Sequence, residues 1–266
     1  MADKTLAITL SYLGSDFHGF ARQDGLATVQ GSLEEALAIL FRRAVDTVGA
    51  GRTDAGVHAL GQVVSFEIDH DELEGRTLAT LTDSLNALTP DSMVVRSVRE
   101  KPAGFSARFS AIDREYRYRL VNRDVAPLFL APYAWWIKEG HLNVNAMLEA
   151  ASVLVGEHDF TSFCMAASSK DKNMVRELRT VHVFGMDHLG EPCIVVQVIG
   201  NAFVHSMVRI IVGTLVQVGL GRRDAGWVAD VLAARDRRSA GQTAPAQGLT
   251  LWRVRYENLP DDPGSW

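Results

Sequence analysis

A short loop flanked by glycines carries the most unusual set of side chains in the chain. Arg52 and Asp54 stand between Gly51 and Gly56 in the sequence GRTDAGVH. Glycine permits backbone angles that other residues resist, so such a loop can direct one side chain into a cleft. The arginine, two residues before the acid, could pair with a phosphate or with the carboxylate itself. The alternative interpretation is an ordinary turn in which the Asp54 side chain bonds to nearby backbone.

A catalytic carboxylate must be ionised, and a free aspartic acid, with a pKa of about 3.9, is ionised at neutral pH. Burial would raise that pKa, so a nearby cation would be needed to keep the charge. Arg209 is a candidate because it interrupts 203–218, a stretch otherwise rich in Met, Val, Ile and Leu. A guanidinium left unpaired in apolar surroundings costs several kcal/mol, so it is expected to find an anion. Alternatively, Arg209 faces solvent or pairs with a different group.

Composition limits the class of protein. The chain has 266 residues, of which 47% are hydrophobic and 22% are charged, as in soluble globular proteins with a buried core. No stretch offers the roughly 20 apolar residues of a membrane span, and the N-terminal segment lacks the apolar core of an export signal. Cys164 and Cys193 stand far apart, which excludes a disulfide framework and a zinc module. The sequence therefore predicts a cytoplasmic protein without a metal site.

Charge is distributed unevenly along the chain. Residues 1–105 carry 9 Lys and Arg against 15 Asp and Glu, a net charge of −6, whereas residues 106–266 carry 18 against 17, a net charge of +1. The total of −5 is unlike that of most nucleic-acid-binding proteins, which more often have a basic domain. Arginines outnumber lysines by 22 to 5. Arginine suits phosphates and stacked bases, although a GC-rich genome would produce the same bias.

Hydrophobic periodicity predicts the elements that position these residues. The expected strands are 5–12, 62–68, 93–100, 112–121, 180–186, 193–199 and 250–256. The expected helices are 29–44, 77–88, 145–154 with an Asn143 cap, 203–218 and 227–234. Residues 193–199 are almost all apolar, which is typical of a central strand. Because helices alternate irregularly with strands, we expect an α+β fold of two similar halves, 1–105 and 106–266, rather than a doubly wound parallel sheet.

Five motifs, in order along the chain, resemble those of the tRNA pseudouridine synthase A family. They are 51–60 (GRTDAGVHAL), 107–111 (ARFSA) with Arg114 and 116–118 (YRY), 159–163 (DFTSF), 201–205 (NAFVH) with 207–209 (MVR), and 243–246 (TAPA) with Gly248, Leu249 and Leu251. Five ordered motifs are far more specific than any one of them. The resemblance implies the pseudouridine synthase fold, a mixed and largely antiparallel sheet flanked by helices. It implies that the catalytic loop lies in the N-terminal half and that the C-terminal half completes the active-site cleft.

The resemblance implies an isomerase that converts uridine to pseudouridine at tRNA positions 38, 39 and 40, in the anticodon stem-loop. This reaction breaks the bond between the ribose and uracil N1, turns the base and rejoins it through C5. Asp54 would be the essential acid, which either attacks the sugar or base or removes a proton at C2′. The reaction needs no redox change or group donor, so no cofactor is expected, and the sequence has no P-loop or dinucleotide motif. A homodimer is also implied.

The same resemblance assigns roles to four further residues. Arg209 would be the counter-ion of Asp54, and Arg52 would help to displace the target nucleotide. Tyr116 would stack on the target base, and Leu249 would be an apolar residue of the pocket. Ordinary packing is the alternative for Tyr116 and Leu249. It is the preferred interpretation for Tyr118, which shares the strand face of Tyr116.

Two groups of basic residues could meet RNA phosphates or form a solvated charged face. They are Arg108, Arg114, Arg117, Arg119 and Arg123, and then Lys170, Lys172, Arg176 and Arg179. His58 and His205 are expected to form structural hydrogen bonds rather than to bind a metal.

The chain departs from the family near its N-terminus. Leu13 stands where the family usually has Asp after the tyrosine of the first strand, and Phe20 and Ala21 stand where it usually has Trp and Gln. These departures concern substrate handling rather than the chemistry. Two other functions remain as alternatives: an RNA-binding protein or folding helper without catalysis, and a related isomerase with another RNA target. The combination of Asp54 with arginines and a tyrosine argues against the first.

Overall fold

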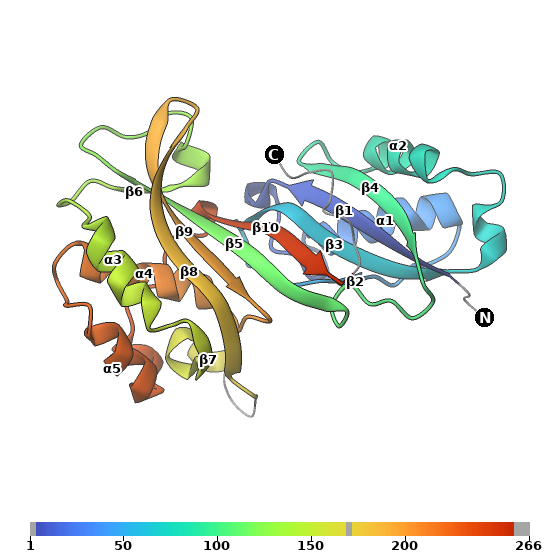
Figure 1. Cartoon of the computed structure of the whole chain (residues 1–266). Coiled ribbons are helices and arrows are strands. Elements are labelled where there is room, and N and C mark those ends of the chain that lie inside the picture. The colour runs from blue at the N-terminus through green and yellow to red at the C-terminus, as the bar shows by residue number, and fades with distance from the viewer. Residues whose placement is uncertain (1–3, 169–171, 258–266) are drawn as a thin grey trace. The chain divides into compact units, whose positions relative to one another are not determined.

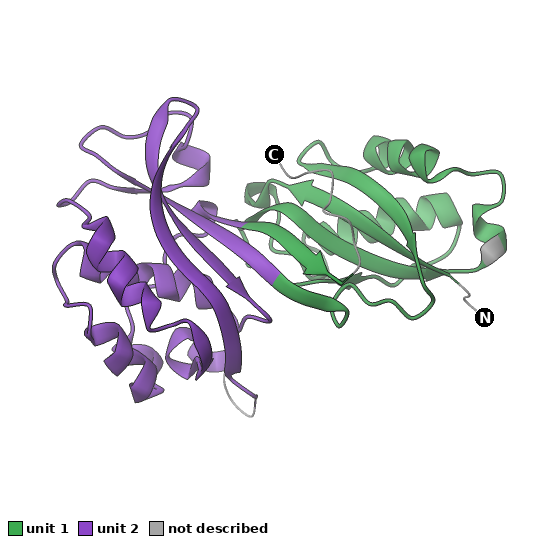
Figure 2. Ribbon diagram, in the orientation of Figure 1, with its two compact units in different colours: residues 1–113, 251–266 green, residues 114–250 purple. Residues whose placement is uncertain are grey.

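The computed structural model describes residues 4–168 and 172–257 (Figure 1). The chain forms two compact units (Figure 2), which we call unit 1 (1–113 and 251–266) and unit 2 (114–250). The first boundary lies within strand β5 (Ala111–Asn122) and the second within strand β10 (Leu249–Tyr256). Each of these strands therefore contributes residues to both units. In the described part of the chain, no helix is long and apolar enough to cross a membrane.

Unit 1 combines a sheet with two helices. Its elements are β1 (Lys4–Tyr12), α1 (Val29–Phe41), β2 (Val48–Gly49), β3 (His58–Ile68), α2 (Leu78–Leu88) and β4 (Met93–Lys101), followed by residues 111–113 of β5 and 251–256 of β10. The strand order is β4-β1-β3-β10, and β1 is antiparallel to both neighbours. Ile8 lies opposite Val64 on β3 and Val98 on β4, and all three are buried. The alternating apolar residues of β1 thus form part of the core of unit 1.

Both helices of unit 1 begin at a threonine cap. The Thr28 side chain accepts a hydrogen bond from the Gly31 N–H, and Thr77 does the same for the Thr80 N–H at the start of α2. Such a cap satisfies one of the backbone donors left free at a helix start. Leu33 and Leu37 of α1 are completely buried, because residues four apart share one face of a helix.

The described residues of unit 2 form a second sheet region and three α-helices. Its elements are β6 (Trp135–Ile137), α3 (Val144–Ser152), β7 (Gly156–Asp159), β8 (Val175–His188), β9 (Glu191–Gly200), α4 (Met207–Gly219) and α5 (Trp227–Ala234). The strand order is β5-β9-β8-β7, with antiparallel pairing, and β6 pairs with β5 in parallel. Eleven of the thirteen residues of α4 are buried, which places this helix in the core of unit 2.

The fold class predicted from the sequence is confirmed: the protein is α+β, with a mixed and largely antiparallel sheet and accompanying helices. The predicted strands and helices are all present. The apolar segment 193–199 forms most of β9, which lies between β5 and β8 as expected of a central strand. Asn143 caps α3, since its side chain accepts a hydrogen bond of 3.0 Å from the Ala146 N–H.

Several boundaries differ from those predicted. The expected helix 203–218 begins only at Met207, after Ser206 adopts a left-handed φ of 58°. The expected helix 29–44 ends at Phe41, because Arg42 adopts a left-handed φ of 55°. Strands β2, β6 and β7 were not expected, since segments of two to four residues show no clear periodicity. The chain leaves unit 1 after residue 113 and returns to it after residue 250. The sequence predicts one boundary, near residue 105.

Candidate active site

Asp54 lies on the loop between β2 and β3, and its side chain is half-buried. A backbone hydrogen bond of 3.1 Å from the Val57 N–H to the Asp54 carbonyl closes the turn. Gly56 has a φ of +80°, a backbone conformation that L side chains rarely adopt. The tight turn predicted for this loop is therefore present. Its glycine has the conformational role that the sequence indicated.

The segment that follows β1 holds this loop in place. The Gly14 carbonyl accepts a bond of 3.2 Å from the Gly56 N–H, and the Gly14 N–H donates at 3.1 Å to Nδ1 of buried His58. A Cβ on Gly14 would overlap the backbone of Val57, so the two segments approach closely at a position where only glycine fits. His58 thus forms a structural hydrogen bond with Gly14, in the segment that holds the Asp54 loop.

Phe20, one of the residues that depart from the family pattern, contacts this loop. The Phe20 N–H donates to the Thr53 carbonyl at 3.0 Å, and the Phe20 ring is buried against Gly49. Leu13 is exposed and its N–H bonds to the Ser92 carbonyl at 2.9 Å. Phe20 therefore supports the backbone just before Asp54. It is a structural residue of the loop in this chain.

Tyr12 and Gln62 form a buried polar pair beneath the loop. The Tyr12 hydroxyl lies 2.8 Å from Oγ1 of Thr53 and 3.5 Å from Nε2 of Gln62. The same Gln62 nitrogen donates to the Gly51 carbonyl at 2.8 Å. Gly51 and Thr53, the two neighbours of Arg52, are thus both hydrogen-bonded to buried side chains. Burial raises the pKa of Tyr12 to about 12, while its two hydrogen bonds act in the opposite direction.

We predict that Tyr12→Phe destabilises the protein by about 1 kcal/mol at neutral pH, because two buried hydrogen bonds are lost. The pKa of Tyr12 is about 12 in the folded state and about 10 in the unfolded state. The stabilising effect of the protonated hydroxyl is complete below pH ~10 and is lost as the pH rises toward 12. Urea unfolding of both proteins between pH 8 and about 11.5 measures the difference in unfolding free energy. A difference that stays constant over this range contradicts the prediction.

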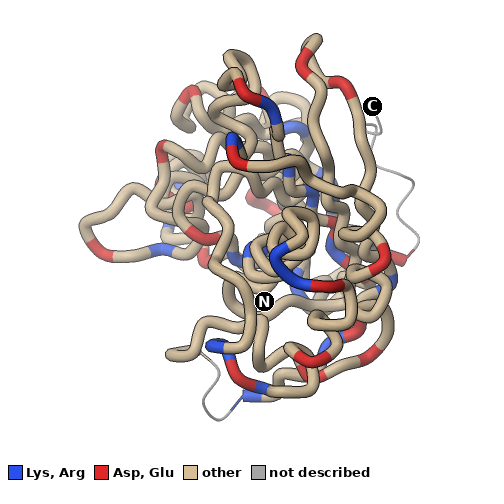
Figure 3. The backbone as a smooth tube through the Cα atoms, turned by 90° about the vertical axis from the view of Figure 1, so that its left-hand side faces the viewer, with Lys and Arg blue, Asp and Glu red and all other residues tan. Residues whose placement is uncertain are grey.

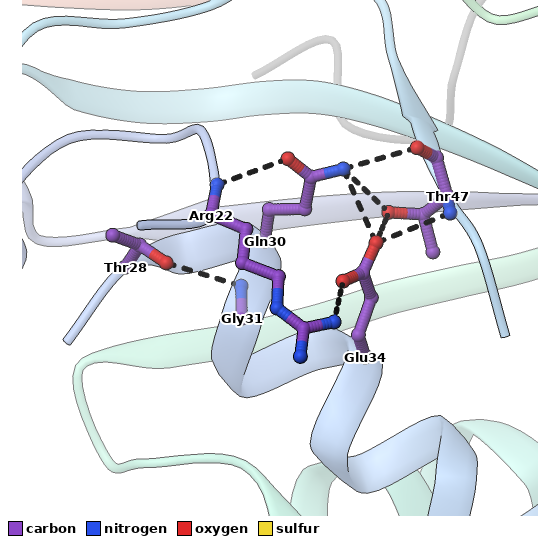
Figure 4. A network of polar contacts seen from close by, with 6 residues as sticks. All are labelled: Arg22, Thr28, Gln30, Gly31, Glu34 and Thr47. Carbon is purple, nitrogen blue, oxygen red and sulfur yellow. Dashed lines mark hydrogen bonds and ion pairs between the residues drawn. The ribbon is translucent and has the colours of Figure 1, made fainter. Parts of the chain in front are cut away.

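A second polar network supports the approach to β2 (Figure 4). Oε1 of buried Glu34 accepts from the Thr47 N–H at 3.2 Å and from the Thr47 hydroxyl at 2.8 Å. Gln30 donates to the Thr47 carbonyl at 3.0 Å, and Arg22 forms an ion pair of 3.2 Å with Glu34. Since Thr47 precedes β2, this network ties the first turns of α1 to the strand that leads into the Asp54 loop.

In unit 2, the predicted site residues come from β5, α4 and the start of β10. Buried Tyr116 of β5 packs edge-on against Phe203, with ring centroids 4.9 Å apart. Tyr118, two residues further on the same strand, donates from its hydroxyl to the Pro245 carbonyl at 2.7 Å. Burial raises the pKa of Tyr118 far above its usual range, and the positive charge of Arg209 partly opposes this. Tyr118 is thus a packing residue, as preferred from the sequence.

Arg209 is held by the backbone of the segment that precedes β10. Its Nε donates to the Ala244 carbonyl at 2.8 Å, and the Ala244 N–H returns a bond of 3.1 Å to the Arg209 carbonyl. Leu249, the first residue of β10, is buried, and the adjacent Gly248 lies against the Tyr118 ring. Two motifs that are about 35 residues apart in the sequence are therefore brought together around the guanidinium of Arg209.

The structure thus groups the predicted site residues by unit. Arg52, which is exposed, and Asp54 lie on one loop of unit 1, whereas Tyr116, Arg209 and Leu249 belong to unit 2. The supporting residues Tyr12, Gln62 and Phe203 were missed. Tyr12 gave a weak signal as a tyrosine at the end of the first strand, next to a departure from the family pattern.

The first basic group is mostly engaged within the protein. Arg114 and Arg119 are buried, and they donate to the Asn201 carbonyl at 2.7 Å and to Thr250 Oγ1 at 3.3 Å. Arg117 pairs with Glu115 at 2.8 Å, and Arg123 with Glu191 at 2.5 Å. In the second group, Lys170 lies outside the described residues. Lys, Arg, Asp and Glu are interspersed along the backbone (Figure 3). Four arginines of the first group therefore bind other groups of the protein itself, and they do not simply form a solvated charged face.

Within the described residues, no group of three or more His, Cys, Asp or Glu side chains could hold a metal ion. His58 accepts from the Gly14 N–H, and Nδ1 of His205 lies 2.7 Å from the Ser168 hydroxyl. Both histidines thus form structural hydrogen bonds.

Comparison with known proteins identifies the class to which this fold and these motifs belong. The sequence model of a family described as tRNA pseudouridine synthase matches residues 8–110 and 150–257. Both the Asp54 loop and Arg209 fall within the matched segments. Pseudouridine synthases are isomerases, and this chain is therefore an isomerase.

Relatives named tRNA pseudouridine synthase A are similar over nearly the whole chain. The protein of Brevibacillus brevis is 45% identical over 253 residues, which cover 95% of this chain and 100% of the relative. Those of Bacillus subtilis and Thermotoga neapolitana are 40% and 38% identical, again over 95% of this chain. The chain belongs to the tRNA pseudouridine synthase A family.

Proposed function

We propose that this protein converts uridine to pseudouridine in the anticodon stem-loop of tRNA, at positions 38, 39 and 40. The observation that carries the proposal is the Asp54 loop, a half-buried acid on a tight turn that is held by hydrogen bonds with Tyr12, Gly14 and Phe20. Such rigid support is typical of a group that must meet a substrate atom in one geometry. The relatives' names and the ordered motifs support the same reaction.

In this proposal Asp54 is the essential carboxylate. It either attacks the sugar or base or removes the proton at C2′ of the ribose. The bond between C1′ and N1 breaks, the uracil turns, and a new bond forms between C1′ and C5. Overall, C5 loses a proton and N1 gains one, so the product is an isomer of the substrate. No electron or group donor is required, and we expect no cofactor.

Four other residues complete the proposed site. Arg209 is the counter-ion of Asp54, and Arg52 helps to displace the target nucleotide. Tyr116 stacks on the target base, and Leu249 supplies an apolar contact. Support for Arg209 comes from its bond of 2.8 Å to the Ala244 carbonyl, which restricts the orientation of its guanidinium.

We expect Arg209→Ala to lower kcat for pseudouridine formation at least about 100-fold, because the proposed site would lose the positive charge that balances the Asp54 carboxylate. Lysine at this position keeps the charge but not the planar Nε–H that bonds to Ala244, so Arg209→Lys should retain part of the activity. Thermal unfolding of each variant separates a catalytic loss from an unfolded protein. An Arg209→Ala protein with full kcat would show that Asp54 does not depend on this cation.

The proposed function is tested by incubating the protein with unmodified tRNA transcripts and mapping each new pseudouridine. New pseudouridine at positions 38, 39 or 40 is the expected result. Modification elsewhere would identify an isomerase with another RNA target. Tight tRNA binding without any modification would favour a binding protein or folding helper.

We predict that treatment with a chelator leaves the rate of pseudouridine formation unchanged, because the isomerisation uses a carboxylate and no metal-bound water or Lewis acid. The rate is measured before and after dialysis against EDTA, and again after addition of Mg²⁺ to restore the fold of the tRNA. A loss of activity that only Zn²⁺ or another transition metal restores would overturn this prediction.

By the same family resemblance, we propose that the protein acts as a homodimer. A cytoplasmic location, expected from the composition, is consistent with a tRNA substrate.

A further inference from the structure

Phe109 is the large hydrophobic residue with the highest exposure among those described: 81% of its surface is open to solvent. It lies in unit 1, on the turn between β4 and β5. A phenylalanine held in water is unfavourable for the isolated protein. Exposure of a single hydrophobic residue does not by itself mark a binding site, so the inference depends on the turn that holds the ring and on the cation beside it.

The turn that carries Phe109 is rigid. The Ser110 N–H bonds to the Ser106 carbonyl at 2.9 Å, and the Ser106 N–H bonds to the Ser110 hydroxyl at 3.2 Å. The Phe109 N–H itself donates to the Ser106 hydroxyl at 3.3 Å. The aromatic ring is thus exposed on a closed turn rather than on a loose loop, so little conformational entropy is lost when it binds a ligand.

Ala107 anchors this turn deep in unit 1. It is completely buried, its N–H donates to Ser65 Oγ at 2.9 Å, and its carbonyl accepts from the Tyr256 hydroxyl at 2.7 Å. Phe109 stands only two residues from this fixed point. Its backbone position is therefore set by the core.

The anchor also connects the turn to the Asp54 loop. Ala107 and Ala50 belong to one buried cluster, and Ala50 directly precedes Gly51 of the loop. The Ala50 N–H donates to the Val63 carbonyl at 2.8 Å, and Ser65, which holds Ala107, is two residues further along β3. Residues two apart on a strand are about 7 Å apart. The turn that carries Phe109 and the segment that leads into the Asp54 loop are thus both hydrogen-bonded to β3, at residues two positions apart.

A cation lies over the exposed ring. The Arg108 guanidinium carbon lies 5.3 Å from the centre of the Phe109 ring, over its face. Lys101 lies in the same way over the neighbouring Phe105 ring, at 5.8 Å from its centre. An aromatic face with cations beside it matches a nucleotide, which offers a flat base and a negative phosphate.

We propose that Phe109 and Arg108 form a stacking platform for an unpaired base of the RNA substrate, next to the uridine that is isomerised. This inference rests on the proposed function, because it takes the substrate to be RNA. The base stacks on the open face of the Phe109 ring, and Arg108 interacts with the ring and the adjoining phosphate. An unpaired base near the target is available in a loop of RNA, where bases can be splayed out.

The test uses an anticodon stem-loop RNA that carries 2-aminopurine, a base whose fluorescence is quenched by stacking, at one loop position after another. Phe109→Leu keeps an apolar side chain but removes the aromatic face, and Phe109→Trp keeps the face. Leucine should abolish the quenching at one position and weaken binding roughly five- to a hundredfold, whereas tryptophan should preserve both. Phe129→Leu is the matched control, since Phe129 is also exposed, at 60%, but lies in unit 2.

The outcomes separate this inference from the proposed function. If the wild-type protein quenches and binds the stem-loop but forms no pseudouridine, the proposed function fails and the platform stands. If the wild-type protein is active and Phe109→Leu quenches and binds like wild type, the platform is wrong. Equal losses in Phe129→Leu would also overturn it. So would an oligomeric state that changes in Phe109→Leu, because the ring would then cover a second copy of the chain.

Discussion

Asp54→Asn is expected to abolish pseudouridine formation while leaving the fold and tRNA binding largely intact. An amide has nearly the shape of the carboxylate, but it is neither a nucleophile nor a base at neutral pH, so kcat should fall by roughly a thousandfold or more. The turn should survive, because it is closed by the Asp54 backbone carbonyl and by Gly56 rather than by the side chain alone. Quantifying pseudouridine in tRNA transcripts measures the loss, and a binding titration measures the affinity.

The matched control is Asp46→Asn. Asp46 is exposed in the same unit and lies outside the loop, so its loss should leave kcat unchanged. Substantial turnover by Asp54→Asn would refute the role of Asp54 in either version of the mechanism. An Asp54→Asn protein that has lost tRNA binding as well would show that the carboxylate maintains the structure of the binding site and does not act in the reaction itself.

Gly213→Ala is expected to destabilise the protein although alanine is the better helix former. In the interior of α4 the change should gain about 1 kcal/mol from helix propensity. The new Cβ, however, would overlap the carbonyl oxygen of Gln242, and a Cβ on Gly241 would lie 2.6 Å from the Gly213 carbonyl in turn. Helix α4 and the segment 241–244 therefore cannot both keep their positions in the variant. Overpacking of this kind costs about 1–3 kcal/mol, and sometimes more.

Movement of that segment also breaks hydrogen bonds. The Gly241 N–H donates to Thr214 Oγ1 at 3.0 Å, and Ala244 exchanges two bonds with Arg209. At about 1 kcal/mol each, these losses outweigh the gain in propensity. We expect Gly213→Ala to lower the free energy of unfolding by about 2–4 kcal/mol. We also expect it to lower kcat, because Arg209 loses the hydrogen bonds that hold it.

Urea unfolding and the pseudouridine assay measure the two effects. Gly185→Ala in β8 is the control, since a Cβ there meets no atom within 4 Å, and it should be close to neutral. A Gly213→Ala protein as stable as wild type would mean that the segment yields without cost. The close approach would then be irrelevant to Arg209.

Long periodic elements were predictable because their signal is local. Leu33 and Leu37 repeat at helical spacing, and residues 193–199 form an almost continuous apolar run. The ends of the elements were less predictable. Arg42 and Ser206 adopt left-handed backbone conformations with no glycine to announce them, and so α1 ends and α4 begins where the apolar pattern continues.

The sequence by itself determined the family, the α+β class and the candidate residues Asp54, Arg52, Tyr116, Arg209 and Leu249, because ordered motifs and periodicity can be read along the chain. Only the tertiary structure decided what holds them. Tyr12 and Thr53 bond across 41 residues, and Gly14 and His58 across 44. It also decided that Arg114 and Arg119 are buried while Phe109 is exposed. Such contacts depend on how strands pair and how loops approach one another, and this leaves no periodic signal in a single sequence.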